Sequence, residues 1–294
     1  MSDWTGVAGK NVVITGATRG IGLAAACELA RRGAQLTIVA RSESRASAAT
    51  ATIVAAGGTG TEVDALLADL SSQSSVRQLA ADILARLPRI DVLVNNAGAI
   101  YARRRLTADG VEQTWALNHL APFLLTCLLL DRLKESVPAR IVTTSSMAHA
   151  GARIPFDDVD AERGYRGMGF ARYGETKLAN ILFTKELARR LEGTGVTANC
   201  FHPGFVASGF NKNNGWPMRV GMTLARPFAR SARKGAETLV WLACAADVSP
   251  ESGGYFANMR SRAPSAAAQD MEAARRLWEM SAEQVGLTDQ EAAG

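Results

Sequence analysis

The 294-residue sequence predicts an α/β protein with one doubly wound parallel sheet of about seven strands flanked by helices. Short runs rich in β-branched residues alternate with longer amphipathic stretches, a pattern typical of a parallel sheet covered on both faces. A glycine-rich turn follows the first run, and polar residues follow most of the others. No repeat, low-complexity tract or linker divides the chain, so we expect residues 1–294 to form a single domain.

Composition and charge fit such a domain and argue against a nucleic-acid binder. Hydrophobic residues make up 47% of the chain and charged residues 21%, which is enough for a sizeable core. The net charge of +5 is only mildly basic. The short basic run at 103–105 lacks interleaved aromatic residues, so we interpret it as a solvated loop.

The four cysteines predict neither a metal site nor a disulfide framework. They are far apart, at positions 27, 127, 200 and 244, and no CxxC pair occurs. Free thiols in apolar contexts fit the cytoplasm. The N-terminal residues MSDWTGVAGK contain no apolar segment of signal-peptide length, and the apolar-rich run at 120–130 is too short to cross a bilayer. We therefore expect a soluble cytoplasmic protein with no membrane anchor and no metal.

The first strand, expected at residues 10–16, runs into the turn TGATRGIG at 15–22 and then a helix. Gly16, Gly20 and Gly22 allow a tight turn and a close approach of the backbone to a ligand. The free N–H groups at the start of the helix would face a phosphate. The spacing is G-x3-G-x-G rather than the common G-x-G-x-x-G. This order of elements predicts a mononucleotide-binding unit of Rossmann type.

The second strand, expected at 33–40, ends at an arginine where an NAD site would carry an acidic residue. Arg41 follows the strand, Arg19 lies in the glycine turn and Arg45 is nearby. A guanidinium pairs with a 2′-phosphate through charge-assisted hydrogen bonds. The sequence therefore predicts NADP(H) rather than NAD(H). The alternative is that Arg41 is a solvated surface side chain.

The remaining elements follow the same alternation. Strands are expected at 61–68, 90–94, 140–144, 196–201 and 254–257, and helices at 43–56, 72–86, 107–134, 171–191, 234–246 and 266–285. Asp69, Asn95 and Ser146 come at the carboxyl ends of strands, as do the glycine turn and Arg41. Ligands of open α/β sheets bind outside these strand ends. We expect these residues to converge on one site.

Two irregular stretches are candidates for substrate-site loops. Residues 147–170 contain four glycines and a proline and are longer than an ordinary connection. Residues 205–233 mix aromatic residues and methionines with glycine and proline, which favours an apolar lid over a site. For the second stretch, a helical excursion that completes the core is the alternative.

The expected helix at 171–191 carries Tyr173 and Lys177 four residues apart, one turn apart on the same face. A neighbouring ammonium favours the phenolate, so we expect Lys177 to lower the pKa of Tyr173 from its usual value of about 10. Such a phenol is a proton donor near neutral pH. By itself, the pattern also fits a helix with a half-buried tyrosine.

These motifs together resemble the short-chain dehydrogenase/reductase family. The resemblance covers roughly residues 9–260 and rests on TGATRGIG, Asn95-Asn96-Ala97-Gly98, Asn118, Ser146, Tyr173-x3-Lys177 and Pro203-Gly204, in that order. Two features resemble the retinol-dehydrogenase-like branch. One is SSMAH followed by an insertion before YGETKLANILF, and the other is the ending from SGGYF to ARRLWEMS.

The resemblance implies four catalytic residues. Tyr173 would be the general acid in reduction and the base in oxidation. Lys177 would hold the nicotinamide ribose and lower the pKa of Tyr173. Ser146 would bind the substrate carbonyl oxygen, and Asn118 would kink its helix and anchor a water that feeds protons to Lys177. His149 stands where the family pattern has glycine.

The resemblance also implies contacts to the cofactor and the substrate. The expected NADP(H) contacts are Gly16, Thr18, Arg19, Gly20, Ile21, Gly22, Arg41, Asp69, Leu70, Asn95, Ala97, Gly98, Tyr173, Lys177, Pro203, Gly204, Val206 and Ser208. The expected substrate contacts are Ser146, His149, Phe205 and Phe210. Helices 107–134 and 171–191 often pack against a partner subunit in this family, so a homodimer or homotetramer fits the resemblance.

The activity implied is NADP(H)-dependent interconversion of an apolar aldehyde or ketone and its alcohol. One alternative is NADPH-dependent reduction of an activated C=C bond on the same scaffold. Another is a non-enzymatic NADP(H)-binding sensor. The intact set of Ser146, Tyr173 and Lys177 favours an enzyme over a sensor.

Overall fold

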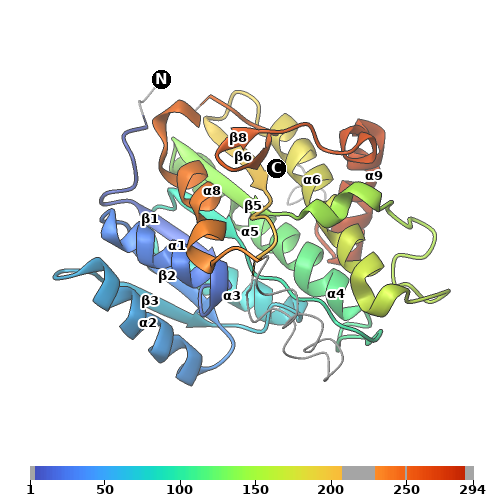
Figure 1. Cartoon of the computed structure of the whole chain (residues 1–294), viewed down its shortest axis with the longest axis horizontal. Coiled ribbons are helices and arrows are strands. Elements are labelled where there is room, and N and C mark those ends of the chain that lie inside the picture. Colours follow the sequence, from blue (N-terminus) through green and yellow to red (C-terminus); the bar gives the residue numbers. More distant parts are fainter. Residues whose placement is uncertain (1–3, 207–228, 249, 289–294) are drawn as a thin grey trace.

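An eight-stranded sheet runs through the computed structural model, which describes residues 4–206, 229–248 and 250–288 (Figure 1). The strand order is β3-β2-β1-β4-β5-β6-β7-β8, and all neighbouring pairs are parallel except β7–β8. The strands are β1 Asn11–Thr15, β2 Gln35–Ala40, β3 Val63–Leu67, β4 Val92–Asn95, β5 Ala139–Thr144, β6 Val196–Phe201, β7 Tyr255–Ala257 and β8 Arg260–Ser261. The predicted doubly wound parallel sheet is confirmed. Its chain order reverses beside β1, where ligands bind in such sheets.

The eighth strand was not predicted because it is only two residues long. It forms a tight hairpin with β7 around Asn258 and Met259, whose φ values are +53° and +56°. Two successive left-handed residues form the hairpin turn that matches the twist of the strands. Methionine rarely adopts that backbone conformation, so the sequence carries no turn signal here.

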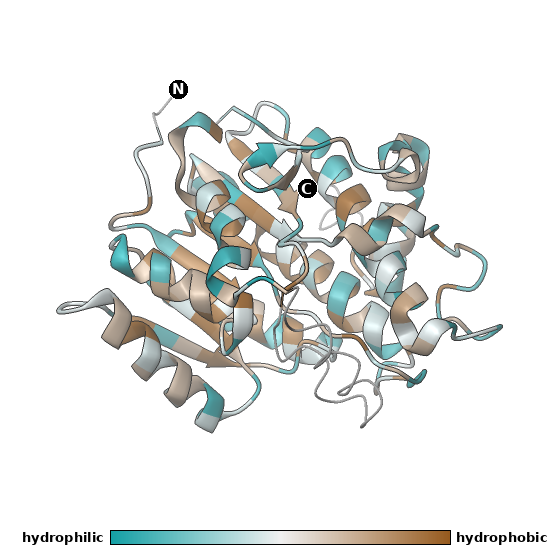
Figure 2. Ribbon diagram, in the orientation of Figure 1, coloured by the Kyte–Doolittle hydropathy of each residue, from teal (hydrophilic) through white to brown (hydrophobic). Residues whose placement is uncertain are grey.

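Helices cover both faces of the sheet (Figure 2). They are α1 Gly20–Arg31, α2 Glu43–Gly57, α3 Gln73–Arg86, α4 Gln113–Trp115, α5 Ala121–Glu135, α6 Phe170–Arg190, α8 Ala232–Cys244 and α9 Met271–Gln284. Successive residues of β1 enter opposite cores: Val12 and Ile14 pack with α1 and α8, and Val13 packs with the core of α3, α5 and α6. The alternation of side chains along a strand produces these two layers.

The helix expected at 107–134 begins later, at Gln113, and is not uniform. The Glu112 carboxylate accepts hydrogen bonds from the N–H groups of Thr114 and Trp115, both at 2.9 Å, and so caps the helix. Residues before it form a turn, with the Thr107 N–H donating to the Val111 carbonyl at 2.8 Å. The hydrogen-bond ladder then widens into a π-helical turn at Ala116–Leu120 before α5.

In the described parts of the chain, one stretch, Gln113–Glu135, is long and apolar enough to cross a membrane. This differs from the expectation that the apolar run at 120–130 is too short, because the flanking turns extend the helix. In its most apolar window, 83% of the residues are buried inside the protein, as in the core helix of a globular domain.

The other differences from the expected elements lie near the C-terminus and in the two irregular stretches. Helix α9 begins at Met271 rather than 266, because the Asp270 carboxylate caps the N–H groups of Glu272 and Ala273. Short 3-10 turns at Met147–Gly151 and Gly167–Gly169 interrupt the stretch 147–170. Residues 207–228 of the predicted lid lie outside the described residues.

Three aromatic side chains join α5, α6 and α9. Ring centroids are 5.6 Å apart for Phe123 and Phe183, 5.0 Å for Phe123 and Trp278, and 5.8 Å for Phe183 and Trp278. Such aromatic pairs add to the stability that their burial supplies. The cluster fixes α6 between a core helix and the C-terminal helix.

Removing the central ring of this cluster should destabilise the fold. Phe123 is fully buried, so Phe123→Ala leaves a cavity and should lower the free energy of unfolding by about 3–5 kcal/mol. Leu67→Ala, at a side chain that is 48% exposed, is the control and should change it by less than about 0.5 kcal/mol. Urea unfolding measures both, and equal transition midpoints for the two variants would contradict the assigned role of the cluster.

Candidate active site

A cavity of about 490 Å³ lies at the carboxyl ends of β1, β2, β4, β5 and β6. Most of the predicted site residues line it. They are Gly16, Thr18, Arg19, Gly20, Ile21, Gly22, Arg41, Leu70, Ala97, Gly98, Ser146, Tyr173, Lys177, Pro203, Gly204, Phe205 and Val206. The sheet therefore brings together residues from strand ends that are far apart in the sequence.

The glycine turn at one side of the cavity has no room for a side chain at Gly16 or Gly22. A Cβ added to Gly22 would lie 2.2 Å from the Gly16 carbonyl oxygen, and one added to Gly16, whose φ is +69°, would lie 2.7 Å from the Cα of Ala97. The Asn96 amide donates to the carbonyls of Thr15 and Gly16 at 3.1 and 3.2 Å. Helix α1 begins at Gly20, so its free N–H groups face the cavity. This turn fits the phosphates of a dinucleotide.

Three arginines gather at the same side of the cavity. Arg19, Arg41 and Arg45 all line it, and none of them forms an ion pair within the described residues. Burial, and then the charges of Arg45 and Arg41, lower the pKa of Arg19. A bound anion would relieve this repulsion between like charges. The cluster fits a third phosphate group, in addition to the two that link the halves of a dinucleotide.

Tyr173, Ser146 and Lys177 lie together at the far side of the cavity, on α6 and the end of β5. The Ser146 hydroxyl is hydrogen-bonded to the Tyr173 phenol. The Lys177 ammonium lies 5.5 Å from the centre of the Tyr173 ring and donates to the Thr144 carbonyl at 2.9 Å. The Ser145 hydroxyl donates to the Lys177 carbonyl at 2.7 Å. Both serines line the cavity, and the Ser146 hydroxyl is the one hydrogen-bonded to the Tyr173 phenol.

The protonation of this group differs from the expectation that Lys177 lowers the pKa of Tyr173. Burial raises the pKa of Tyr173 to about 12, and the Ser146 hydrogen bond only partly opposes that rise. Burial also lowers the pKa of Lys177 to about 7. The expected lowering of the Tyr173 pKa is not found, because removal from water disfavours the charged form of each group. Negative charge arriving in the cavity would restore the charge on Lys177.

Asn118 lies just behind the cavity wall, in the π-helical turn. Its side chain accepts from the Ala99 N–H and donates to the Ala99 carbonyl, both at 2.8 Å, and donates to the Thr176 hydroxyl at 3.1 Å. A Cβ added to Gly98 would lie 3.2 Å from Oδ1 of Asn118 and 3.6 Å from Nζ of Lys177. Asn118 and Lys177 therefore meet behind Gly98.

Besides Asn118, three predicted residues do not line the cavity. Asn95 is buried and donates to the Thr126 hydroxyl at 2.9 Å, and its neighbour Asn96 faces the glycine turn instead. Asp69 accepts from the N–H and hydroxyl of Ser71 at 3.0 and 2.8 Å, while the adjacent Leu70 lines the cavity. Adjacent residues at a strand end face opposite ways, and the sequence does not say which one faces the ligand.

The third residue, His149, is buried behind Ser146. Its ring nitrogens lie 2.7 Å from the Ser146 carbonyl oxygen and 3.1 Å from the Ser265 N–H, and its ring packs at 5.0 Å on Tyr255. Burial lowers its pKa, which favours the neutral ring. His149 therefore supports Ser146 rather than lining the substrate entrance. Ser208 and Phe210 lie outside the described residues.

Some residues at the cavity were missing from the sequence-based set. Asn96 was named only as part of a motif, and Arg45 only as a neighbour of Arg41. Met147 and Phe170 line the mouth beside the predicted Phe205, and these three side chains are 64%, 48% and 47% exposed. Met147 directly follows Ser146 and Phe170 comes three residues before Tyr173, which is the one signal that could have found them.

The close packing of the glycine turn gives a test of the phosphate cradle. Gly22→Ala places a methyl group against the Gly16 carbonyl, so the turn must shift, and we expect dinucleotide affinity to fall at least about tenfold. Gly151→Ala is the control, since its Cβ would meet nothing within 4 Å. Fluorescence titration with NADPH measures both dissociation constants. Unchanged affinity in Gly22→Ala would contradict the assignment of this turn.

The chain matches known proteins along most of its length. The family model described as short chain dehydrogenase matches residues 10–217. Mouse retinol dehydrogenase 12 is 43% identical over 281 residues, covering 96% of this chain and 88% of the relative. Human retinol dehydrogenase 13 is 42% identical over 288 residues, covering 96% and 86%.

Solved structures share the fold. An uncharacterised protein from Mycobacterium paratuberculosis has a TM-score of 0.78 at 32% identity, covering 97% of this chain and 98% of that one. Pseudomonas aeruginosa RhlG in its active-site complex with NADP has a TM-score of 0.69 at 27% identity, covering 87% and 97%. A Burkholderia cenocepacia short chain dehydrogenase in complex with NADP has a TM-score of 0.68 at 27% identity, covering 90% and 99%.

These matches agree with the glycine turn, the strand-end cavity and the Ser146, Tyr173 and Lys177 group described above. The chain therefore belongs to the short-chain dehydrogenase/reductase family of nicotinamide-dependent oxidoreductases, in its retinol-dehydrogenase-like branch.

Proposed function

We propose that this protein is an NADP(H)-dependent carbonyl reductase or alcohol dehydrogenase that acts on apolar aldehydes, ketones and alcohols. The observation that carries the proposal is that Ser146, Tyr173 and Lys177 open on the same cavity as the glycine turn. Because one space holds both sets of groups, a carbonyl next to Tyr173 would lie beside the cofactor that the turn binds.

The preference for NADP(H) rests on the arginine cluster. Arg19, Arg41 and Arg45 converge on one end of the cavity, and no carboxylate of the described residues pairs with them. A 2′-phosphate would supply the missing negative charge and accept charge-assisted hydrogen bonds. An acidic residue after β2, which would favour the free ribose hydroxyls of NAD, is absent from that position.

The nicotinamide cofactor supplies or accepts the hydride, and the side chains of this chain handle the proton and the oxygen. In reduction, the Tyr173 phenol donates its proton to the carbonyl oxygen as negative charge develops there. Ser146 donates a second hydrogen bond to the same oxygen. When an anionic neighbour favours the protonated form of Lys177, its ammonium stabilises the phenolate that Tyr173 becomes after it donates its proton.

An apolar substrate is supported by the mouth of the cavity. Met147, Phe170 and Phe205 expose large apolar surfaces there, and such surfaces bind groups that gain by leaving water. The curated relatives are named retinol dehydrogenases, which act on an alcohol by that name. We also propose a cytoplasmic location, because the four free cysteines are all buried and reduced thiols fit that compartment.

A panel of apolar aldehydes and ketones, each with NADPH and with NADH, tests the reaction. We expect cofactor oxidation with some of them, and Tyr173→Phe should lower turnover on the order of 10²-fold or more while NADPH binding is kept. The loss of one hydroxyl removes the proton donor and little of the packing. Near-normal turnover in Tyr173→Phe would exclude its role as the donor.

The same panel separates the alternatives. Product analysis that finds a saturated carbonyl from an unsaturated one would support the C=C reductase instead. NADPH binding without turnover of any carbonyl would support the sensor.

A charge reversal tests the cofactor preference. Arg41→Asp should weaken NADPH binding by at least about tenfold and leave NADH binding near its original value, because only NADPH carries the 2′-phosphate. Arg275→Asp makes the same charge change on the exposed face of α9 and is the control. Equal losses for NADPH and NADH in Arg41→Asp would refute a contact between Arg41 and the 2′-phosphate.

A further inference from the structure

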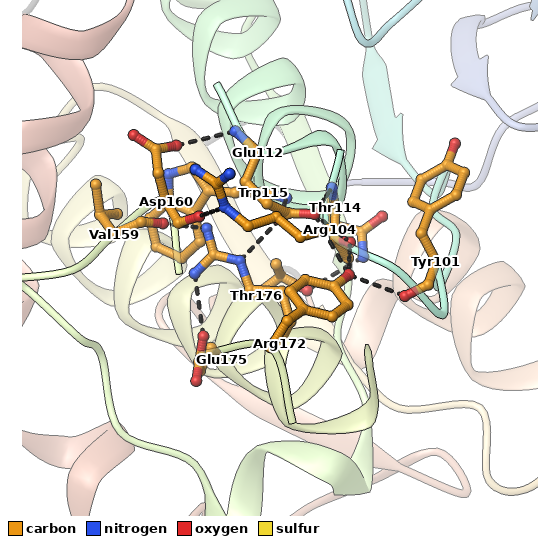
Figure 3. A network of polar contacts seen from close by, with 12 residues as sticks. Tyr101, Arg104, Glu112, Thr114, Trp115, Val159, Asp160, Arg172, Glu175 and Thr176 are labelled. Carbon is orange, nitrogen blue, oxygen red and sulfur yellow. Dashed lines mark hydrogen bonds and ion pairs between the residues drawn. The ribbon is translucent and has the colours of Figure 1, made fainter. Parts of the chain in front are cut away.

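A buried ion pair between Arg172 and Glu112 joins the starts of two helices (Figure 3). Nε of Arg172 lies 2.8 Å from Oε2 of Glu112, and the two side chains are 1% and 0% exposed. Arg172 is the residue before Tyr173. Neither charge touches the cavity, so the reaction as described above does not use them.

Glu112 has a complete set of donors around its carboxylate. The N–H and hydroxyl of Thr114 donate to one oxygen at 2.9 Å, and the N–H of Trp115 donates to the other at 2.9 Å. Glu112 thus caps the helical segment that carries Asn118. Its charge is held at the positive end of that helix, where it is most stable.

Arg172 lies in the first turn of α6, where a cation opposes the helix dipole. Three groups compensate for this. The Glu112 carboxylate pairs with Nε, the Glu175 carboxylate lies 3.0 Å from one terminal nitrogen, and the other terminal nitrogen donates to the Val159 carbonyl. The guanidinium also stacks at 4.7 Å on the Trp115 ring. Its position is therefore defined from several directions.

The pair also holds the insertion at 147–170 against both helices. The Glu112 N–H donates to the Asp160 carboxylate at 2.9 Å, next to the Val159 carbonyl that Arg172 holds. The Tyr165 hydroxyl donates to the Tyr101 carbonyl at 2.8 Å, and its oxygen lies 3.0 Å from the Thr114 hydroxyl oxygen (Figure 3). The insertion, the Asn118 helix and the Tyr173 helix meet at this one network.

We infer that Arg172 and Glu112 are positioning residues, which set the start of α6 against the Asn118 segment and thereby aim the Tyr173 phenol at Ser146. A buried ion pair adds little net stability compared with apolar side chains of the same size, so stability alone does not account for it. It does impose a defined geometry, because the planar guanidinium donates its hydrogen bonds only in certain directions.

The inference rests on the proposed function, because displacement of Tyr173 matters through proton transfer. A displacement of about 1 Å at a reacting group lowers turnover by up to about 10²-fold. Binding of NADPH depends mainly on the glycine turn and the arginines, which lie elsewhere. We therefore expect a loss in kcat with little change in the KM for NADPH.

The other end of α6 provides a matched control. Arg190 pairs at 2.8 Å with Glu186, whose side chain is fully buried, and stacks at 4.3 Å on Trp278. Arg172→Met and Arg190→Met each remove an Arg–Glu ion pair stacked on a tryptophan from the same helix, near Tyr173 in one case and far from it in the other. The Arg190 side chain is 20% exposed and Glu186 keeps its pair with Arg189, so we expect the smaller loss of stability at that end. Thermal unfolding shows how much each substitution costs the fold.

Assayed below both unfolding transitions, Arg172→Met should lower kcat at least about tenfold, with the KM for NADPH within about twofold. Arg190→Met should leave kcat within about twofold. Arg172→Lys, which keeps the charge and loses the planar fork, should recover only part of the rate. A folded Arg172→Met with normal kcat, or an equal loss in Arg190→Met, would overturn the inference. If Arg172→Met does not fold, Arg172→Lys and Glu112→Gln are judged by the same criterion.

A second measurement does not depend on turnover. The chain has four tyrosines, so fluorine NMR of protein labelled with fluorotyrosine gives few signals, and Tyr173→Phe identifies the one from Tyr173. We expect that signal to move in Arg172→Met and to stay in place in Arg190→Met. If wild-type protein turns over no carbonyl, the proposed function fails while this result still decides the role of the pair. An unmoved Tyr173 signal would overturn it.

Discussion

Two hydrogen bonds to a single carbonyl join α6 to the sheet. The Thr144 oxygen, at the end of β5, accepts from Nζ of Lys177 at 2.9 Å and from the Asn180 amide at 3.1 Å. Both donors are buried, so loss of this acceptor would leave an unpaired ammonium and an unpaired amide in the core. These bonds place the face of α6 that bears Tyr173 beside the strand end that bears Ser146. The positions of Tyr173 and Ser146 relative to each other, and to the cavity that they line, depend on these two hydrogen bonds.

The same burial that fixes the helix controls the chemistry of its side chains. Tyr173 and Lys177 are shifted in opposite directions, toward the neutral form in each case, because protein atoms replace water around both. The neutral phenol of Tyr173 suits a proton donor, because it still carries its proton when the substrate binds. A ligand of opposite charge that enters the cavity would favour the charged form of either group.

Much of the fold and the site could be predicted from the sequence because the signals are local. Periodic apolar runs predicted each strand longer than two residues, and the spacing of Tyr173 and Lys177 predicted their common helix face. What could not be predicted depends on tertiary packing. Nothing in the sequence says that Asn96 rather than Asn95 faces the glycine turn, or that His149 packs behind Ser146.

The start of the Asn118 helix was missed for a similar reason. Glu112 ends a turn and caps the helix, and Arg172, sixty residues later in the sequence, pairs with its carboxylate in the core. The helical pattern extends back to residue 107, so the sequence alone does not place the start of the helix at Gln113.

The contrast between the two halves of the cofactor cavity has an evolutionary consequence. At Gly16 and Gly22 not even one methyl group fits, so any substitution there requires the turn to shift. Arg41 and Arg45, by contrast, have exposed side chains that line the cavity, although Arg41 is also hydrogen-bonded to Tyr101. If the arginines bind the 2′-phosphate as proposed, a few surface substitutions would change the preferred nicotinamide cofactor, while the glycine turn stays unchanged. The positions at which no side chain fits are thus separate from the positions at which a side chain can change.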